Sequence, residues 1–210
     1  HTAQYLDSLN SSANAARIAE LPILSLMPNS LIQKCLLAPM RYATAGTMLG
    51  IDIALNHGWA INLSGGYHHA KSDSGSGFCF FADIPLAVSK LQRDKPGIRI
   101  LIVDLDAHQG NGVSETLESV SDVFILDVYN SELLFPNDLE AAKKVHFPYR
   151  VSADIKDDDY LLLVASVVLK AIKESCPDFI IFNAGTDIYR EDPLGGMGIS
   201  HGAIVKRDEI

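Results

Sequence analysis

One sequence feature most constrains the fold of this chain. It is an apolar run followed by acidic and imidazole side chains at alternate positions. Residues 98–103, Ile-Arg-Ile-Leu-Ile-Val, predict a buried parallel strand, and Asp104, Asp106 and His108 follow it at every second position. Alternate side chains of an extended segment share one face, so these three point the same way. Buried carboxylates are costly without a compensating charge, and oxygen and nitrogen ligands suit a divalent metal. The sequence therefore predicts a metal site where this strand ends.

Strand-like and helix-like segments alternate along the chain, which is typical of an α/β protein. We expect a three-layer fold in which a mainly parallel sheet carries helices on both faces, formed as a single domain over residues 1–210. The expected strands are 59–63, 98–104, 123–127 and 179–183. The expected helices are 3–20, 44–57, 84–92, 112–118 and 158–174, with loops at 21–29 and 72–77.

The polar clusters of the sequence all follow predicted strands. His68 and His69 come after residues 59–63, and Asp187 comes after residues 179–183. Ligands of open α/β sheets bind beyond the carboxyl ends of the strands. This shared position favours one functional site at that edge of the sheet.

Asp106, His108 and Asp187 would supply one nitrogen and two carboxylate ligands. Such a set leaves a coordination position open for water or substrate, as catalytic zinc sites do. A zinc ion there would activate water for attack on a carbonyl group. The alternative is that Asp106 caps a helix and His108 lies on the surface, and Asp187 in N-A-G-T-D weakens that alternative.

The adjacent imidazoles of His68 and His69 follow the flexible turn Gly65-Gly66. Histidine transfers protons near neutral pH, so the pair could act as acid and base. Taken alone, such a pair is more often a solvated loop feature. A carboxylate such as Asp104 could fix the tautomer of one ring by accepting its N–H.

The remaining loop features carry weaker signals. Phe78 and Leu194, each taken alone, would be expected to pack in the core, although as walls of a narrow channel they would fit a long aliphatic chain. The run Lys156 to Asp159 predicts a solvated helix start, to which we assign no chemistry. No glycine-rich phosphate-binding fingerprint is present.

Composition excludes several classes of function. The 210 residues are 48% hydrophobic and 20% charged, as in ordinary globular proteins, and a net charge of -9 argues against direct nucleic-acid binding. Three cysteines without close pairing predict neither disulfides nor a thiolate zinc site. We expect no membrane span, and a cytoplasmic location, or a nuclear one in a eukaryote. Oligomeric state is left open.

Several motifs together closely resemble the zinc-dependent histone deacetylases of the arginase-deacetylase superfamily. Within that family the chain most resembles the class IV branch, on G-W-A-I-N at 58–62, D-V-Y-N at 127–130, R-x-D-x-L-G-G at 190–196 and I-V-K-R-D-E at 204–209. The motifs shared with the wider family are G-G-Y-H-H-A at 65–70, S-G-F-C-F at 76–80, D-L-D-A-H-Q-G-N-G at 104–112 and N-A-G-T-D at 183–187.

The resemblance implies a role for each candidate residue. Asn111 stands where many relatives carry an aspartate beside the second histidine, which puts the support of His69 in doubt. The other implied roles are zinc ligation by Asp106, His108 and Asp187, proton transfer by His68 and His69, support of His68 and of a monovalent cation such as K⁺ by Asp104, and an acyl-lysine channel lined by Gly77, Phe78 and Leu194.

One departure from the family concerns its catalytic tyrosine, which donates a hydrogen bond to the oxyanion from a second Gly-Gly-Tyr element. That element lies downstream of Lys-Arg-Asp-Glu in relatives, and the present sequence ends at Ile210. The family's first strand would likewise precede His1. We therefore expect a domain incomplete at both ends, without its outermost strands, and inactive or poorly folded as an isolated segment.

The preferred interpretation is a zinc-dependent hydrolase that removes an acetyl or longer acyl group from a lysine side chain of a protein or peptide. One alternative is a non-catalytic module that binds metal or acyl-lysine, and another is an acetylpolyamine amidohydrolase. A ureohydrolase of the arginase fold is disfavoured, because Gln109-Gly110 stands where a further metal ligand would be needed.

Overall fold

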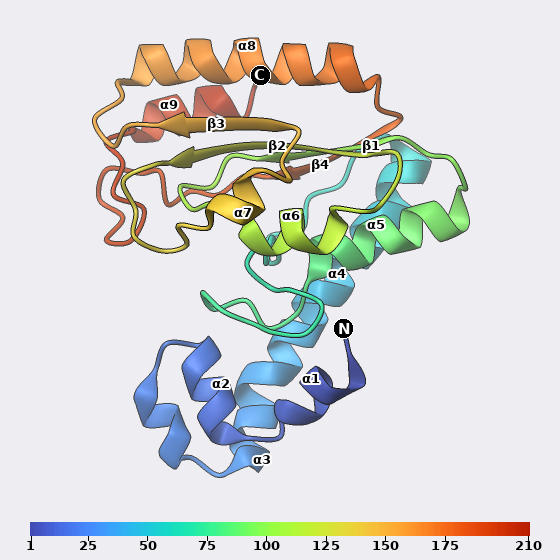
Figure 1. Ribbon diagram of the computed structural model, residues 1–210, viewed down its shortest axis with the longest axis vertical. Helices are drawn as coiled ribbons and strands as arrows, with labels where there is room; N and C mark the ends of the chain where they lie inside the picture. Colours follow the sequence, from blue (N-terminus) through green and yellow to red (C-terminus); the bar gives the residue numbers. More distant parts are fainter. The chain divides into compact units, whose positions relative to one another are not determined.

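The computed structural model describes residues 1–210 and divides into two compact units, His1–Pro96 and Gly97–Ile210. The N-terminal unit contains helices and irregular segments, and the C-terminal unit contains all four strands of the sheet (Figure 1). None of the helices combines the length and apolar character needed to span a bilayer. The helices of the first unit are α1 (Ala3–Ser8), α2 (Ser12–Ile18), α3 (Asn29–Ile32), α4 (Ala38–His57) and α5 (Asp83–Asp94), with a 3-10 turn at Pro22–Leu26 and a π turn at Gln33–Leu37.

The prediction of one continuous helix over residues 3–20 was wrong, because this segment forms two helices, α1 and α2. Each has its own N-cap: the Thr2 hydroxyl accepts from the Tyr5 N–H at 3.2 Å, and the Ser11 hydroxyl accepts from the Asn14 N–H at 3.4 Å. Ser and Thr favour caps because their side chains satisfy backbone donors that the first helical turn leaves open. The two short helices pack with residues 32–37 and 80–81 in an apolar cluster around Leu9.

The predicted strand over residues 59–63 is absent, and this segment is irregular. Its alternation of apolar side chains resembles a strand, yet Trp59, Ile61 and Leu63 are exposed by 72%, 73% and 97%. A strand needs a hydrogen-bonded neighbour, and the N-terminal unit contains no other strand that could pair with it. The His68–His69 pair therefore follows a loop and not a strand.

The sheet of the C-terminal unit is parallel throughout, with strand order β3-β2-β1-β4. Three strands were predicted, and β3 was missed because its sequence, Phe-Pro-Tyr-Arg-Val, contains a proline and an exposed arginine. Proline is tolerated on an edge strand, where one side of the backbone has no partner. The strands are β1 (Ile100–Asp104), β2 (Val123–Asn130), β3 (Phe147–Val151) and β4 (Phe179–Asn183).

Helices cover both faces of this sheet, as the α/β prediction required. α8 (Asp157–Ser175) and α9 (His201–Arg207) lie on one side of the strands, and α6 (Asn111–Leu117) and α7 (Leu139–Ala142) lie on the other (Figure 1). All five residues of β1 are buried, which explains its unbroken apolar run. The predicted strands 98–104, 123–127 and 179–183 and helices 112–118 and 158–174 are confirmed to within a few residues, whereas α9 was not predicted.

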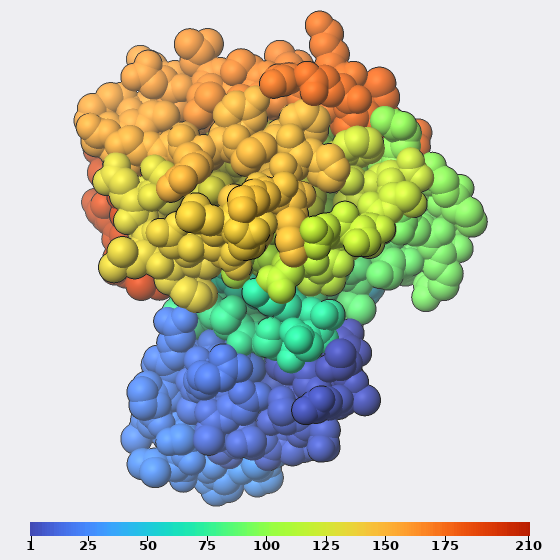
Figure 2. Space-filling view, viewed as in Figure 1, coloured from blue at the N-terminus to red at the C-terminus, as the bar shows by residue number.

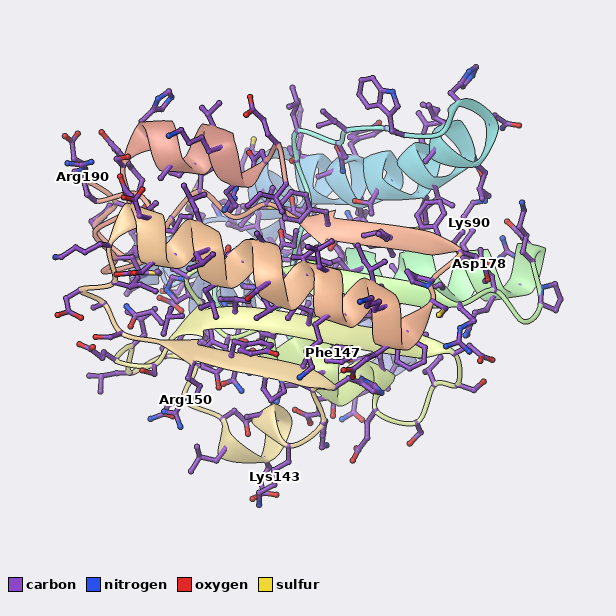
Figure 3. The ribbon with its side chains drawn as sticks, turned by 90° about the horizontal axis from the view of Figure 1, so that it is seen from above. Lys90, Lys143, Phe147, Arg150, Asp178 and Arg190 are labelled. Atoms are coloured by element: carbon purple, nitrogen blue, oxygen red, sulfur yellow. The ribbon has the colours of Figure 1, made fainter.

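α8 supplies much of the core on its face of the sheet. Figure 3 looks down on this helix, with Phe147 and Arg150 labelled on the edge strand β3. Val164 and Val167 of α8 pack in the same apolar cluster as Leu101 of β1. The opposite side of α8 is exposed and forms part of the surface in Figure 2 (orange). The helix is therefore amphipathic, with one buried stripe.

Candidate metal centre

Two neighbouring parallel strands deliver the predicted ligands to one edge of the sheet. β1 and β4 are paired in register from Ile100 opposite Phe179 to Asp104 opposite Asn183. Asp106 and His108 follow β1 directly, and Asp187 lies in the loop after β4. Because parallel strands end at the same edge, these loops are adjacent.

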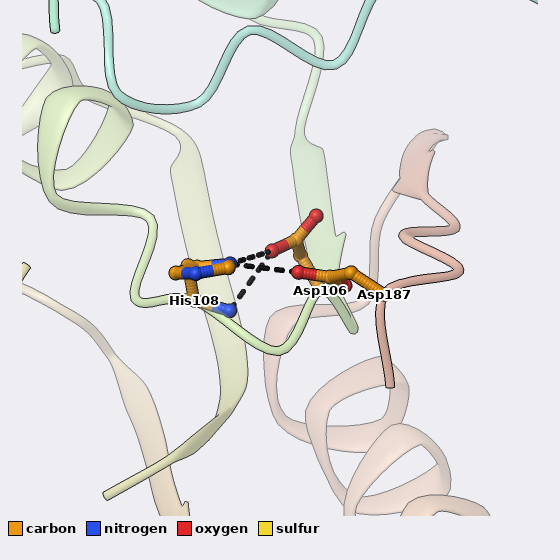
Figure 4. Close-up of side chains that lie close together, drawn as sticks. All are labelled: Asp106, His108 and Asp187. Carbon is orange, nitrogen blue, oxygen red and sulfur yellow. Dashed lines mark hydrogen bonds and ion pairs between the residues drawn. The ribbon is translucent and has the colours of Figure 1, made fainter. Parts of the chain in front are cut away.

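Asp106, His108 and Asp187 converge within this edge (Figure 4). His108 Nδ1 lies 2.7 Å from Asp187 Oδ2 and 3.2 Å from Asp106 Oδ1. One ligand atom from each residue can be chosen so that all lie within 4.8 Å of one another. The three side chains are between 17% and 19% exposed, so the cluster is largely but not completely buried.

Backbone N–H groups fix the two carboxylates. The Ala107 N–H donates to Asp187 Oδ1 at 2.9 Å, and the His108 N–H donates to Asp106 Oδ1 at 2.9 Å. The first of these bonds joins the loop after β1 to the loop after β4. Such bonds orient metal-binding carboxylates before a metal arrives.

Two glycines allow the ligand loops to pack this closely. A Cβ atom on Gly185 would overlap Asp106 Oδ2 and lie 2.6 Å from Asp106 Cα, and one on Gly195 would overlap the carbonyl oxygen of Asp187. Any other residue would force the ligands apart. In the sequence Gly195 stands out only as part of the R-x-D-x-L-G-G motif, because its close approach to the Asp187 backbone is a property of the folded chain.

The electrostatics of the cluster fit a cation. Burial lowers the pKa of His108, but hydrogen bonds to Asp106 and Asp187 and their charges outweigh burial and raise it to about 9. The two carboxylates therefore attract positive charge strongly enough to hold a proton on the imidazole at neutral pH. One imidazole and two carboxylates are a donor set that suits zinc and similar divalent metals.

Asp104 and Asn111, the predicted supporting residues, are both buried. Asp104 Oδ1 accepts from the Asn183 side-chain amide at 2.9 Å and from the Asp106 N–H at 3.2 Å. Asp104 therefore braces the loop that carries Asp106. Asn111 is the first residue of α6, and its carbonyl accepts from the Ser114 hydroxyl at 3.1 Å. The roles expected of both toward the histidines remain predictions.

The N-terminal unit carries the histidine pair on a loop. The rings of His68 and His69 have centroids 4.1 Å apart and are tilted by 49°, and both residues are buried. This burial excludes a freely solvated pair, which was the alternative interpretation. The placement of the two rings side by side suits a shared role in proton transfer.

Asp83, which sequence reasoning missed, organises this loop. Its fully buried carboxylate accepts from the Gly66 N–H at 2.9 Å, the Tyr67 N–H at 2.8 Å and the Thr47 hydroxyl at 2.7 Å. Gly65 leaves room for this contact, since its φ is +137° and a Cβ there would lie 2.7 Å from Asp83 Oδ2. In the sequence Asp83 appears only as an acidic residue at the start of a helix. That position indicates a favourable interaction with the helix dipole and no role in a neighbouring loop.

The predicted channel residues lie on two loops: Gly77 is buried, whereas the side chains of Phe78 and Leu194 are more exposed than core residues. Phe78 is 45% exposed with φ of +64°, next to Gly77 with φ of +51°. Leu194 is 54% exposed in a turn whose N–H groups bond to Asp192. The expectation that Phe78 and Leu194 pack in the core was therefore wrong. A bulky residue at positive φ is strained, and such strain is concentrated at functional sites.

Comparison with known proteins decides the family. The sequence profile described as the histone deacetylase domain matches residues 1–209. The chain belongs to the histone deacetylase family. It is 41% identical over 209 residues to histone deacetylase 2 of Arabidopsis thaliana, covering 100% of this chain and 54% of that protein. Histone deacetylase 2 of Oryza sativa subsp. japonica is 33% identical over 166 residues, which cover 74% of this chain and 32% of that protein.

The fold of this family is also found among solved structures. A crystal structure of an HDAC homolog complexed with SAHA superposes with a TM-score of 0.68 at 28% identity, covering 80% of this chain and 47% of that one. This match agrees with the predicted arginase-deacetylase type of α/β fold. The chain spans about half the length of the first of its curated deacetylase relatives, at 54%.

Proposed function

We propose that this histone deacetylase family member is a zinc-dependent hydrolase that removes acetyl or longer acyl groups from lysine side chains. The observation that carries the proposal is the convergence of Asp106, His108 and Asp187 at the ends of β1 and β4. Family membership supports deacetylation as the reaction class. The motifs quoted above favour the class IV branch within the family.

In this proposal Asp106, His108 and Asp187 hold the zinc ion. With only three protein ligands, a position remains for water or a substrate oxygen. When bound, zinc would act as a Lewis acid that lowers the pKa of water to about 7 and polarises an amide carbonyl. The backbone bonds from Ala107 and His108 keep the two carboxylates oriented throughout.

The histidine pair would move the protons of the reaction. His68 and His69 are assigned to taking the proton of the attacking water and to protonating the departing lysine amine. Asp104 is assigned to supporting His68 and a monovalent cation such as K⁺. Asn111 is neutral, so it can donate or accept a hydrogen bond but cannot stabilise an imidazolium as an aspartate would.

The substrate would be an acyl-lysine in a protein or peptide. Gly77, Phe78 and Leu194 are assigned to its aliphatic part, because the exposed apolar side chains of Phe78 and Leu194 can line a channel for methylene groups. A net charge of -9 is compatible with a cationic substrate and argues against direct nucleic-acid binding. We propose a cytoplasmic or nuclear location and no membrane partner.

An assay of zinc content together with deacylation tests this function. The protein expressed from its complete reading frame is given acetyl-lysine and longer acyl-lysine peptides, and acetylated polyamines as competitors. We expect peptide hydrolysis at stoichiometric zinc, and loss of both zinc and hydrolysis in Asp187→Asn. Retained hydrolysis in a zinc-free variant would contradict the proposal. Peptide binding without turnover would favour a binding module, and turnover of polyamines alone would change the substrate class.

A further inference from the structure

A buried arginine lies beside the two loops that carry the candidate metal ligands. Arg207, the last residue of α9, is 2% exposed, and its side chain is fully buried. A buried guanidinium is costly unless its donors are paired. The partners it finds therefore indicate what this residue does.

Arg207 donates to backbone carbonyls of both ligand loops. Its Nη1 bonds the carbonyl of Leu105 at 3.3 Å and that of Gly185 at 2.6 Å, and its Nη2 bonds the carbonyl of Ala184 at 3.3 Å. Leu105 immediately precedes Asp106, and Gly185 lies two residues before Asp187. A single side chain thus joins the loop after β1 to the loop after β4.

The hydrogen bond from Arg207 to Gly185 affects the candidate ligand Asp106, because Gly185 contacts Asp106. Gly185 packs so closely on Asp106 that no Cβ would fit between them. Fixing the Gly185 carbonyl therefore fixes the surface against which the Asp106 carboxylate rests. Displacements well below 1 Å matter at such a site, because ligand geometry must be held to about 0.5 Å.

We propose that Arg207 is a positioning residue that sets the separation of Asp106 and Asp187 and so tunes metal affinity. The inference rests on the proposed metal at Asp106, His108 and Asp187. Arginine suits this task because its planar fork presents several donors in fixed directions, whereas a lysine ammonium presents a single flexible centre.

The surroundings of Arg207 make it a rigid clamp. The Phe182 ring of β4 lies 5.8 Å from its guanidinium carbon, and the Asp208 carboxylate accepts from Nε at 2.8 Å. The far end of α9 is fixed to α8, because the Ser200 hydroxyl donates to Asp157 at 2.5 Å. Asp208 also neutralises the guanidinium charge, which would otherwise oppose a bound cation.

The experiment compares zinc affinity with fold stability in the protein expressed from its complete reading frame. Arg207→Lys and Arg207→Met remove the fork, and Asp208→Asn removes the neighbouring carboxylate charge while keeping an acceptor oxygen for Arg207 Nε. The control is Val167→Ala, which alters the apolar core on α8 without removing any hydrogen bond. Zinc affinity is measured by competition with a chromophoric chelator, and ligand geometry by the visible spectrum of the cobalt(II) form.

We expect both Arg207 variants to bind zinc about 10- to 100-fold more weakly than wild type, with an altered cobalt spectrum. Asp208→Asn should weaken zinc binding less and in the same direction. Val167→Ala should lower the melting temperature and leave zinc affinity and the cobalt spectrum unchanged. Wild-type affinity in folded Arg207 or Asp208 variants would overturn the inference. Absence of zinc binding in the wild type would instead overturn the proposed metal site.

Discussion

The two units stabilise the loops that carry their candidate site residues with buried side chains of opposite charge. In the N-terminal unit the Asp83 carboxylate accepts from the backbone N–H groups of Gly66 and Tyr67, next to the histidine pair. In the C-terminal unit the Arg207 guanidinium donates to backbone carbonyls of Leu105, Ala184 and Gly185, next to the candidate metal ligands.

The difference follows from which backbone groups each loop leaves unpaired. Buried N–H and C=O groups outside helices and sheets still need partners. A turn rich in glycine points several N–H groups inward and needs an acceptor, whereas two loops leaving parallel strands turn carbonyls inward and need a donor. In each unit a single ionised side chain satisfies several groups, so its loss should affect a whole loop.

Glycine substitution in the C-terminal loops should have the largest effect. Gly195→Ala and Gly185→Ala place a methyl group inside the atoms of Asp187 and Asp106, so we expect zinc affinity to fall by about 100-fold or the unit to unfold. Gly198→Ala is the matched control, because its Cβ would lie 3.9 Å from the Ala153 carbonyl oxygen. Zinc titration with a melting curve checks each variant, and unchanged zinc affinity in Gly195→Ala would contradict the proposed packing.

Removal of the Asp83 carboxylate should have the second-largest effect. Asp83→Ala leaves two backbone N–H groups and the Thr47 hydroxyl without their acceptor, and we expect a loss of about 2–4 kcal/mol in the free energy of unfolding. Asp83→Asn keeps one acceptor oxygen and should lose less. Urea unfolding measures both. Equal stability of Asp83→Ala and wild type would show that this carboxylate does not organise the loop.

Loss of the Ser200 cap should weaken the support of Arg207 by a smaller amount. Ser200→Ala removes the N-cap of α9 and a bond to Asp157, at a cost of about 1–2 kcal/mol. Hydrogen bonds from the Ser200 hydroxyl and N–H lower the pKa of Asp157. That contribution to stability is present above the ordinary aspartate pKa and is lost as the pH falls through the lowered pKa.

The wild type and Ser200→Ala should therefore approach each other in stability as the pH falls below about 4. Unfolding curves at several pH values test this, with Ser166→Ala on the exposed side of α8 as the control. A constant difference at all pH values would mean that Asp157 does not contribute through Ser200.

The smallest effect on stability is expected at Phe78. Phe78→Gly relieves a positive φ of 64° but adds backbone freedom to the unfolded chain, so stability should stay within about 1 kcal/mol of wild type. If Phe78 contacts the acyl chain, hydrolysis of long acyl-lysine peptides should fall more than hydrolysis of acetyl-lysine peptides. An equal fall for all chain lengths would remove Phe78 from the acyl channel.

The C-terminal unit could be predicted well because its signals are local. Long apolar runs mark β1, β2 and β4, and the candidate ligands Asp106 and His108 stand at fixed offsets from a strand end. Parallel pairing of β1 with β4 then brings Asp187 to the same edge. A buried strand and the polar residues that follow it are contiguous in sequence, so the sequence alone can predict them.

The remaining features could not be predicted because they depend on distant contacts. Residues 59–63 have the alternation of a strand but no strand within their unit to pair with. β3 contains Pro148, which a single sequence cannot distinguish from a loop proline. The roles of Asp83, Arg207 and Gly195 arise from groups that are between 8 and 102 residues away in sequence.

The metal content and ligand set of the protein test the central claim most directly. X-ray absorption spectroscopy of the zinc-loaded protein, expressed from its complete reading frame, should show one zinc per chain with nitrogen and oxygen neighbours, a single imidazole and no sulfur. Asp187→Asn should lose this zinc while remaining folded, because asparagine can still accept from the Ala107 N–H. A sulfur ligand, or the same spectrum and zinc content in Asp187→Asn, would contradict a metal centre built from Asp106, His108 and Asp187.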